Sequence, residues 1–298
     1  MKKLLIILII ITLTGCSSYI ELNDLAIINS IGIQKDDNNY KISISLLNEV
    51  DKDTLEPSLR LIEINNTNLN LAFEELSLNL NKQIYLSHLN LLVIDDSIKK
   101  MEIKEIINYF LNNQDARENF LIVFSNKIEK ILTNSKFQEI NNLVKINQET
   151  TSKVIYTTMY DLIKNYYDTK SFYLTNIDYN DNLFAKGIIK FSNNNYKELD
   201  EDDGLFINYL LNNIETFTYT YKCQENKYLN LKILKSTSNN LKNNLIITNE
   251  INIIRNECNY SNKQINKIIT NYLKDNLLKF TNKNIKINNT IRGNYENK

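Results

Sequence analysis

The sequence predicts a mixed α/β fold of the α+β type, organised as three domains that each pair a small sheet with helices. Strand-like and helix-like periodicities alternate between residues 40 and 135. From about residue 136 a long polar stretch replaces this alternation, and the last third carries strand patterns before one strong amphipathic helix. A chain of 298 residues has room for two or three domains, because a domain usually takes about 100 to 150 residues. We place the domains at 17–135, 136–215 and 216–298.

Residues 1–16 are predicted to be a bacterial lipoprotein signal peptide. Lys2 and Lys3 supply the positive start, residues 4–11 form an apolar run too short to span a bilayer, and Leu13-Thr14-Gly15-Cys16 fits the lipobox. Processing would leave Cys16 as the lipid-carrying first residue, so the mature chain is expected at a membrane surface outside the cytoplasm. The alternative is an ordinary signal peptide or anchor helix followed by a chance cysteine.

In the first domain, residues 40–46 alternate apolar and polar side chains, which is the pattern of a half-buried strand, and residues 60–64 are its expected partner. The continuous apolar runs at 89–94 and 120–124 are typical of buried central strands. Helices are predicted over 69–80 and 103–111, followed by a short helix that Asn126 caps together with Glu129.

In the middle domain, apolar residues from Met159 to Tyr166 lie at helical spacing, and residues 183–199 are expected to form a hairpin with its turn at 193–195. The acidic cluster at 198–203, closed by Gly204, is predicted to be a solvated turn. Carboxylates this close together repel one another unless water screens them.

In the last domain, three antiparallel strands are predicted around residues 217–221, 229–233 and 247–253. Ser261 and Gln264 form a capping box in front of the amphipathic helix from Ile265 to Leu277. A final strand is predicted over residues 285–291.

Catalysis is poorly supported. His88 is the only histidine and borders an apolar run, where a hydrogen-bonded structural role is the expected one. The five glycines show neither nucleophile-elbow nor phosphate-loop spacing, and the acidic cluster lacks the spaced ligands of a calcium loop. With 35 basic and 35 acidic residues, the chain has no charge excess that would recruit nucleic acid. We predict no enzyme, no metal, no cofactor and no nucleic-acid partner.

Two further residue sets leave alternatives open. Outside the cytoplasm Cys223 and Cys258 are free to form a disulfide, but a reducing niche would leave two buried thiols. Four tyrosines either line a recognition surface or, as the commoner outcome at helical spacing, belong to the core; they are Tyr156, Tyr160, Tyr166 and Tyr167. Gly32, Gly187 and Gly204 are expected at turns or close backbone approaches.

Three segments carry a family resemblance. The first runs from Glu21 to Ile27 and continues to Gly32-Ile33, the second runs from Tyr85 to Leu89 and on to Val93-Ile94, and the third runs from Gly187 to Phe191 and reaches Leu199 and Asp203-Gly204. In this order and spacing they resemble the GerC family, the C-subunit lipoproteins of spore germination.

The resemblance implies a three-domain α/β lipoprotein on the outer face of the spore inner membrane. It further implies one subunit of a nutrient germinant receptor, assembled with integral membrane partners. The chain departs from the family at Ser17 to Ile20, which replaces a tryptophan-containing segment, and between Phe280 and Ile285, where a long stretch is missing and the last domain is shortened.

Glu21, Asn23 and Asp24 follow the lipid site and are predicted to meet a partner or headgroups, with a solvated linker as the alternative. For the whole chain, the alternative function is a lipid-anchored solute-binding protein of a transporter. That class requires two similar α/β lobes with a pocket between them, and the strand-rich last third does not mirror the first.

Overall fold

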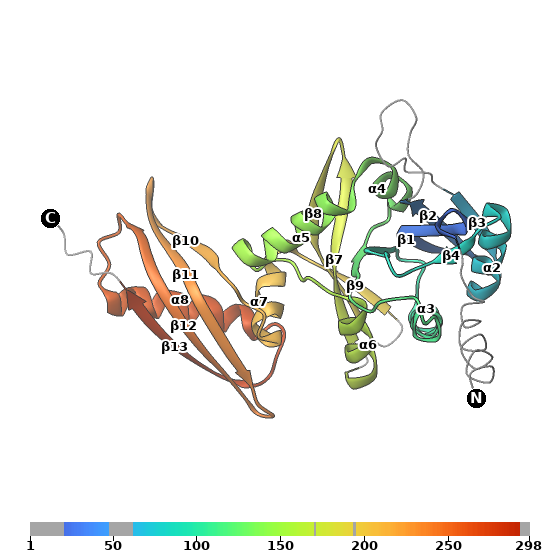
Figure 1. Cartoon of the computed structure of the whole chain (residues 1–298). Coiled ribbons are helices and arrows are strands. Elements are labelled where there is room, and N and C mark those ends of the chain that lie inside the picture. The colour runs from blue at the N-terminus through green and yellow to red at the C-terminus, as the bar shows by residue number, and fades with distance from the viewer. Residues whose placement is uncertain (1–20, 48–61, 170, 193–194, 293–298) are drawn as a thin grey trace, which may run out of the picture.

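The structure is a computed structural model that describes residues 21–47, 62–169, 171–192 and 195–292 (Figure 1). These residues form two sheets, one of nine strands and one of four, with helices packed on both. The predicted α+β class is confirmed. Cys16, the loop around Pro57 and most of the predicted 193–195 turn lie outside the described residues.

The larger sheet has the strand order β3-β2-β1-β5-β6-β7-β8-β9, and β4 pairs with the start of β1. The pairs from β1 through β5 and β6 to β7 are parallel, while both flanks are antiparallel. The strands are β1 (Leu25–Asp36), β2 (Asn39–Leu46), β3 (Ile62–Asn66), β4 (Gln83–Tyr85), β5 (Leu91–Ile94), β6 (Leu121–Phe124), β7 (Ser171–Asn180), β8 (Asn182–Ser192) and β9 (Asn195–Leu199).

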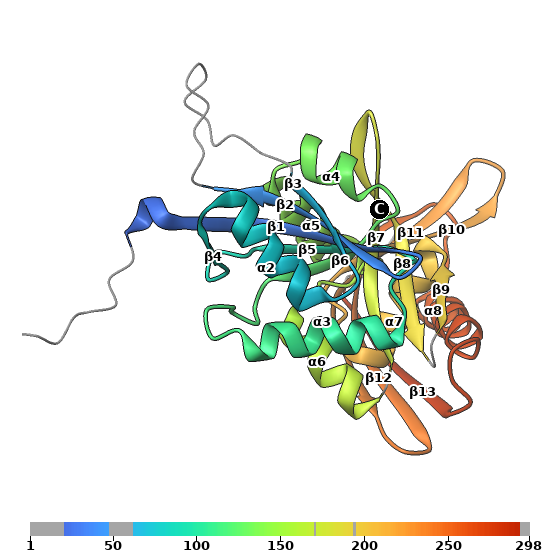
Figure 2. The same ribbon diagram turned by 90° about the vertical axis from the view of Figure 1, so that its right-hand side faces the viewer.

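Helices cover both faces of this sheet, which explains the continuous apolar runs. Figure 2 shows α2 (Leu69–Leu80) and α3 (Lys100–Asn112) on one side of the strands and α4 (Ile128–Asn134) on the other. Leu92 and Ile94 of β5 pack into the core that contains α2 and α3, whereas Leu91 and Val93 pack into the core that contains α4 and α5 (Phe137–Thr151). Because alternate residues serve opposite cores, every position of β5 must be apolar.

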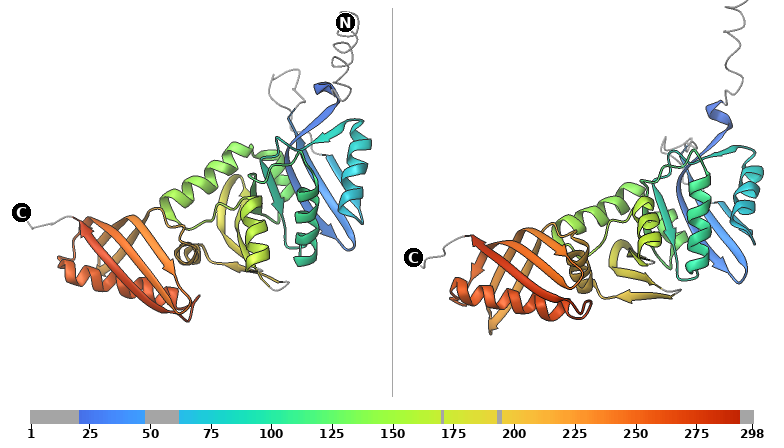
Figure 3. Two further views of the ribbon diagram at one scale, coloured as in Figure 1. Left: turned by 60° about the horizontal axis from the view of Figure 1, so that its bottom comes forward. Right: turned by 90° about the horizontal axis from the view of Figure 1, so that it is seen from below.

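The smaller sheet lies at the end of the molecule opposite β1 (Figure 3). Its strands β10 (Phe217–Gln224), β11 (Lys227–Asn240) and β12 (Asn244–Asn256) are antiparallel, as predicted. β13 (Asn284–Arg292) pairs parallel to β12, and the crossover between them carries α8 (Asn262–Leu277). Ile265, Ile269 and Leu273 of α8 are fully buried against the sheet.

The acidic cluster is not the predicted turn. Asp200 is the N-cap residue and Glu201, Asp202 and Asp203 form the first turn of α7 (Glu201–Leu211), with Gly204 inside the helix. Carboxylates at a helix N-terminus interact favourably with the exposed N–H groups and the helix dipole, and this attraction offsets their mutual repulsion. The buried face of α7 packs into the core of the second sheet through Leu205, Phe206 and Tyr209.

Two other local predictions need correction. Asn126 does not cap α4, whose N-cap residue is Lys127 with no side-chain cap; the Asn126 side chain accepts a hydrogen bond from the Asp96 backbone N–H instead. The polar stretch after residue 136 contains the helix α5, which buries only Ile140 and Val144 from its own length. Two fully buried residues in a 15-residue helix leave a weak apolar signal.

The middle segment was expected to form its own sheet, but its strands β7, β8 and β9 belong to the nine-stranded sheet. β6 and β7 are parallel neighbours, in which Val123 pairs with Thr175 and Phe124 pairs with Asn176. Segments 17–135 and 136–215 therefore share one sheet. The expected boundary at 215/216 coincides with the start of the second sheet at β10. The division into three domains therefore stays a proposal, in which the first two would be joined by a continuous sheet.

Candidate functional site

The predicted partner-binding residues lie exposed just before the first strand, β1. Glu21, Asn23 and Asp24 are solvent exposed, and Leu22 to Asp24 form a single 3-10 turn that leads directly into β1. Leu22 itself exposes 65% of its surface. Among the described residues no helix is long and apolar enough to cross a membrane.

His88 does not occupy a buried site. It lies exposed between β4 and β5, where its backbone carbonyl accepts a hydrogen bond from the Asn90 side chain at 2.9 Å. Over the described ranges no group of three His, Cys, Asp or Glu side chains is placed to hold a metal ion.

Cys223 at the end of β10 and Cys258 after β12 are joined by a disulfide in the structure, with their Cα atoms 6.1 Å apart. This separation lies inside the range that a disulfide requires. The oxidised state of the pair in the cell stays a prediction, and its consequence for stability is argued below.

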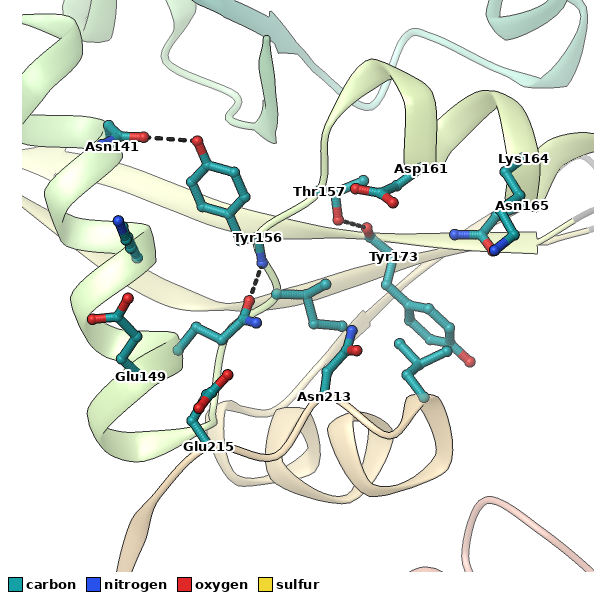
Figure 4. A pocket seen from close by; sticks show the side chains of 14 residues that line it. Asn141, Glu149, Tyr156, Thr157, Asp161, Lys164, Asn165, Tyr173, Asn213 and Glu215 are labelled. Carbon is teal, nitrogen blue, oxygen red and sulfur yellow. Dashed lines mark hydrogen bonds between the residues drawn. The ribbon is translucent and has the colours of Figure 1, made fainter. Parts of the chain in front are cut away.

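A cavity of about 670 Å³ lies beside the segment that links the two sheets. Figure 4 shows α5 on one side of it, α6 (Met159–Asp168) above and the end of α7 below, with residues 155–157 and β7 between them. Sequence reasoning missed this cavity because its lining comes from five segments between residues 141 and 215. No local pattern reports such a meeting of distant segments.

Hydrogen bonds hold the walls of the cavity in place. The Tyr156 hydroxyl donates to Asn141 Oδ1 at 2.8 Å, and the Tyr156 backbone N–H donates to Gln148 Oε1. The Thr157 hydroxyl donates to the backbone carbonyl of Tyr173 at 2.8 Å. Since both tyrosines are partly buried, desolvation raises the pKa of their hydroxyls, so they remain protonated at neutral pH.

Five charged side chains line the cavity, and only one of them is engaged by its surroundings. Asp161 closes the capping box of α6, where it accepts from the Thr158 backbone N–H at 3.0 Å and hydroxyl at 2.6 Å. The other four, Lys145, Glu149, Lys164 and Glu215, form no ion pair within the described part of the chain.

The four tyrosines do not form one surface. Tyr156 lines the cavity and Tyr166 packs partly against the core that contains α2 and α3. Tyr160 and Tyr167 expose 58% and 55% of their surfaces on α6. The four tyrosines thus lie in three different environments: the cavity wall, the edge of a core and the exposed surface of α6.

Two of the three glycines allow close backbone approach. A Cβ on Gly204 would lie 1.7 Å from the Lys153 carbonyl oxygen, and one on Gly187, whose φ is +146°, would lie 2.6 Å from the Leu199 carbonyl oxygen. At Gly32 a Cβ would instead meet the Ile128 side chain of α4 at 2.2 Å. Gly32 therefore allows α4 to pack closely against β1.

Together these features define an elongated α+β protein with an exposed segment before β1 and a polar cavity beside the segment that leads to its second sheet. Residues 18–179 match the family described as the spore germination protein N-terminal domain. The match covers more than half of the chain, which therefore belongs to this family, and the GerC-type resemblance is confirmed.

Two proteins illustrate the relationship. Spore germination protein KC of Bacillus subtilis (strain 168) is 27% identical over 181 residues, which make up 54% of this chain and 44% of the relative. The aligned part is thus less than half of that relative's length. The crystal structure of the GerBC protein matches with a TM-score of 0.52 at 10% identity, over 88% of this chain and 96% of that chain. This second likeness supports the fold alone.

Proposed function

We propose that this chain is the lipid-anchored subunit of a nutrient germinant receptor and acts at the outer face of the spore inner membrane beside integral membrane subunits. The observation that carries the proposal is the family match, which begins at residue 18, two residues after the lipobox cysteine Cys16. A germination domain that starts directly behind a predicted lipid site supports a role at a membrane surface.

The physics of lipid anchoring supports a membrane partner. A single acyl chain binds a bilayer only marginally and reversibly, so stable residence takes a second attachment. In this proposal the integral subunits supply that attachment. Glu21, Asn23 and Asp24, exposed just before β1, lie among the first described residues after the predicted lipid site Cys16. We propose that these three residues meet the membrane partner, as predicted from the sequence.

The test is a pull-down of the full chain from detergent-solubilised spore membranes. We expect two polytopic membrane proteins to be recovered with the wild type and to be weakened or lost with Cys16→Ala. The matched control is Ser17→Ala, which changes the neighbouring residue and leaves the lipid site intact.

Three outcomes would contradict the proposal. Recovery of a permease with its ATPase would indicate a solute-binding protein, although the two sheets differ in strand number and order and do not form similar lobes. Recovery of no partner, or nutrient germination that is unchanged when the gene is deleted and no paralogue substitutes, would also exclude a receptor subunit.

A further inference from the structure

Three helices, α2, α3 and α6, cover one face of the nine-stranded sheet (Figure 2). Their buried sides belong to one hydrophobic core, in which the ring of Phe73 on α2 stacks on that of Tyr109 on α3 with centroids 4.1 Å apart. The other sides of the same helices face solvent. We call these three helices the α2-α3-α6 layer.

Each helix of the α2-α3-α6 layer exposes large apolar side chains. Leu71 and Leu78 lie seven residues apart on α2, which is about two turns, so both point away from the core. Leu78 exposes 80% of its surface, and Met101 on α3 exposes 73%. The other exposed members are Leu111 on α3 and Tyr160 and Tyr167 on α6.

The helices on the opposite face of the sheet differ. Within their described residues, α4 and α5 expose a single large apolar side chain, Ile146. Exposed apolar residues that stand singly are normal on a protein surface, whereas a set of them on one side indicates a contact with a protein or a membrane.

The α2-α3-α6 layer begins beside the predicted lipid site. Four residues, 17–20, separate Cys16 from Glu21. Because a fully extended chain covers at most about 3.6 Å per residue, Glu21 stays within about 18 Å of the lipid-bearing residue. The last turn of α2 leads into β4, where Gln83 pairs with the first residue of β1. The exposed Leu78 in that turn therefore lies at the tethered end of the sheet.

The charges and the tether together decide what covers this layer. Its exposed charged residues include Lys99, Lys104 and Lys164 as well as Glu74, Glu105 and Asp168. Neither sign dominates, whereas a strongly anionic membrane attracts surfaces with an excess of lysine and arginine. Zwitterionic headgroups require no such excess, and tyrosine suits them because its ring is apolar and its hydroxyl is polar. The short tether favours a bilayer over a protein partner, since it holds this end of the sheet at the lipid surface whether or not a partner is present.

We propose that the α2-α3-α6 layer lies on the bilayer and inserts its exposed leucines, Met101 and its exposed tyrosines into the headgroup region of zwitterionic phospholipid. The proposal rests on the lipid anchor at Cys16 in the proposed function. It adds a direct lipid contact to the attachment that the integral subunits supply, and it defines which side of the nine-stranded sheet faces the membrane.

The experiment uses single tryptophans, because the chain contains none of its own. Leu78→Trp and Met101→Trp place the probe on the layer, and Ile146→Trp, at an exposed apolar position on α5, is the matched control on the opposite face. Each chain, purified with its lipid, is reconstituted into phosphatidylcholine vesicles in which part of the lipid carries bromine on its acyl chains. Bromine quenches a tryptophan that contacts the lipid.

We expect the emission of Leu78→Trp and Met101→Trp to shift to shorter wavelength on the vesicles and to lose intensity to the brominated lipid. Ile146→Trp should keep the emission of a tryptophan in water. Iodide, a quencher dissolved in the water, should give the reverse pattern. Addition of anionic phosphatidylglycerol should not increase the shift, because the layer has no excess of basic residues. Equal melting temperatures will show that the variants fold, and Leu71→Trp provides a second position on α2.

Flotation of the vesicles on a density gradient reports the anchor separately. A chain that floats while its layer tryptophans emit as in water overturns the bilayer contact, leaves the receptor proposal standing and indicates that a protein covers the layer. Quenching of Ile146→Trp as strong as that of Met101→Trp, or quenching that requires phosphatidylglycerol, also overturns the inference. A chain that does not float refutes the lipid anchor, and the inference with it.

Discussion

Single residues fix how the segment at 152–154 meets α7. Asn208 is fully buried and donates through its amide to the carbonyl oxygens of Ser152 and Val154, each at 2.8 Å. One turn earlier, Gly204 brings the helix against the Lys153 carbonyl. Both contacts join the segment directly before the cavity-lining residues 155–157 to the helix that packs on the second sheet.

Gly204→Ala should destabilise the protein by about 3 kcal/mol, because the added Cβ would lie 1.7 Å from a backbone oxygen and force the helix away. The sign is informative, since glycine to alanine in an unconstrained helix interior stabilises by up to about 1 kcal/mol. Urea denaturation measures the change, with Lys232→Gln, an exposed substitution on β11, as control. A neutral or stabilised Gly204→Ala protein would contradict the close packing.

A partly buried ion pair makes stability depend on pH. Lys35 Nζ lies 2.6 Å from Glu102 Oε1, and the Lys99 backbone N–H donates to Glu102 Oε2 at 3.2 Å. Burial raises the pKa of Glu102, but the hydrogen bond and charge of Lys35 and the backbone N–H groups together hold it below its usual value. The folded pKa is therefore lower than the unfolded one, which is about 4.3.

Lys35→Met should thus cost about 2 kcal/mol at pH 7, where the pair is fully formed. The difference from wild type should shrink as pH falls below about 4.3 and through the folded pKa, since Glu102 is then protonated in both proteins. Urea denaturation at pH 7 and at low pH measures this. Lys186→Met breaks the exposed pair with Glu198 and should cost less than about 1 kcal/mol. A Lys35→Met cost that is equal at both pH values would refute the assignment.

At the scale of elements, the sequence predicted those helices and strands that carry their own local signal. The α8 stripe and the capping box at Ser261 and Gln264 both appear in the structure as predicted. The helix α5 was missed because the residues that bury Ile140 and Val144 are distant in sequence. The strand β7 was missed although its hairpin partner β8 follows it directly, since the parallel pairing with β6 that places it inside the sheet is not local. The acidic cluster was misassigned because repulsion was weighed without the helix dipole, and the cavity was missed because no single segment contains it.

Ser261→Ala tests the best-predicted element. The Ser261 hydroxyl accepts the Gln264 backbone N–H at 3.4 Å, and the Gln264 side chain accepts the Ser261 backbone N–H at 2.9 Å. Loss of the cap should lower the free energy of unfolding by about 1 kcal/mol. Thermal unfolding followed by circular dichroism measures the effect, and Lys263→Ala, an exposed change in the first turn of α8, should be nearly neutral.

At the scale of the whole molecule, the chain contains separate hydrophobic cores. Two of them pack on opposite faces of the nine-stranded sheet, and another lies between the second sheet, α8 and α7. The contacts of α7 with segment 152–154 connect these parts, and the cavity lies beside that connection.

Separate cores predict two unfolding transitions, and the disulfide should distinguish them. Cys223 and Cys258 are 35 residues apart and both belong to the smaller sheet unit, so the bond restricts the unfolded state of that unit alone. Reduction should lower its stability by about 3 kcal/mol and leave the nine-stranded unit unchanged. Differential scanning calorimetry with and without dithiothreitol should therefore show one transition that shifts and one that does not.

The control is Cys223→Ala, which should reproduce the reduced profile without reductant and should not respond to reductant. A single transition that shifts as a whole would show that the two sheets unfold as one cooperative unit, and a profile insensitive to reductant would show that the cysteines are thiols in the purified protein.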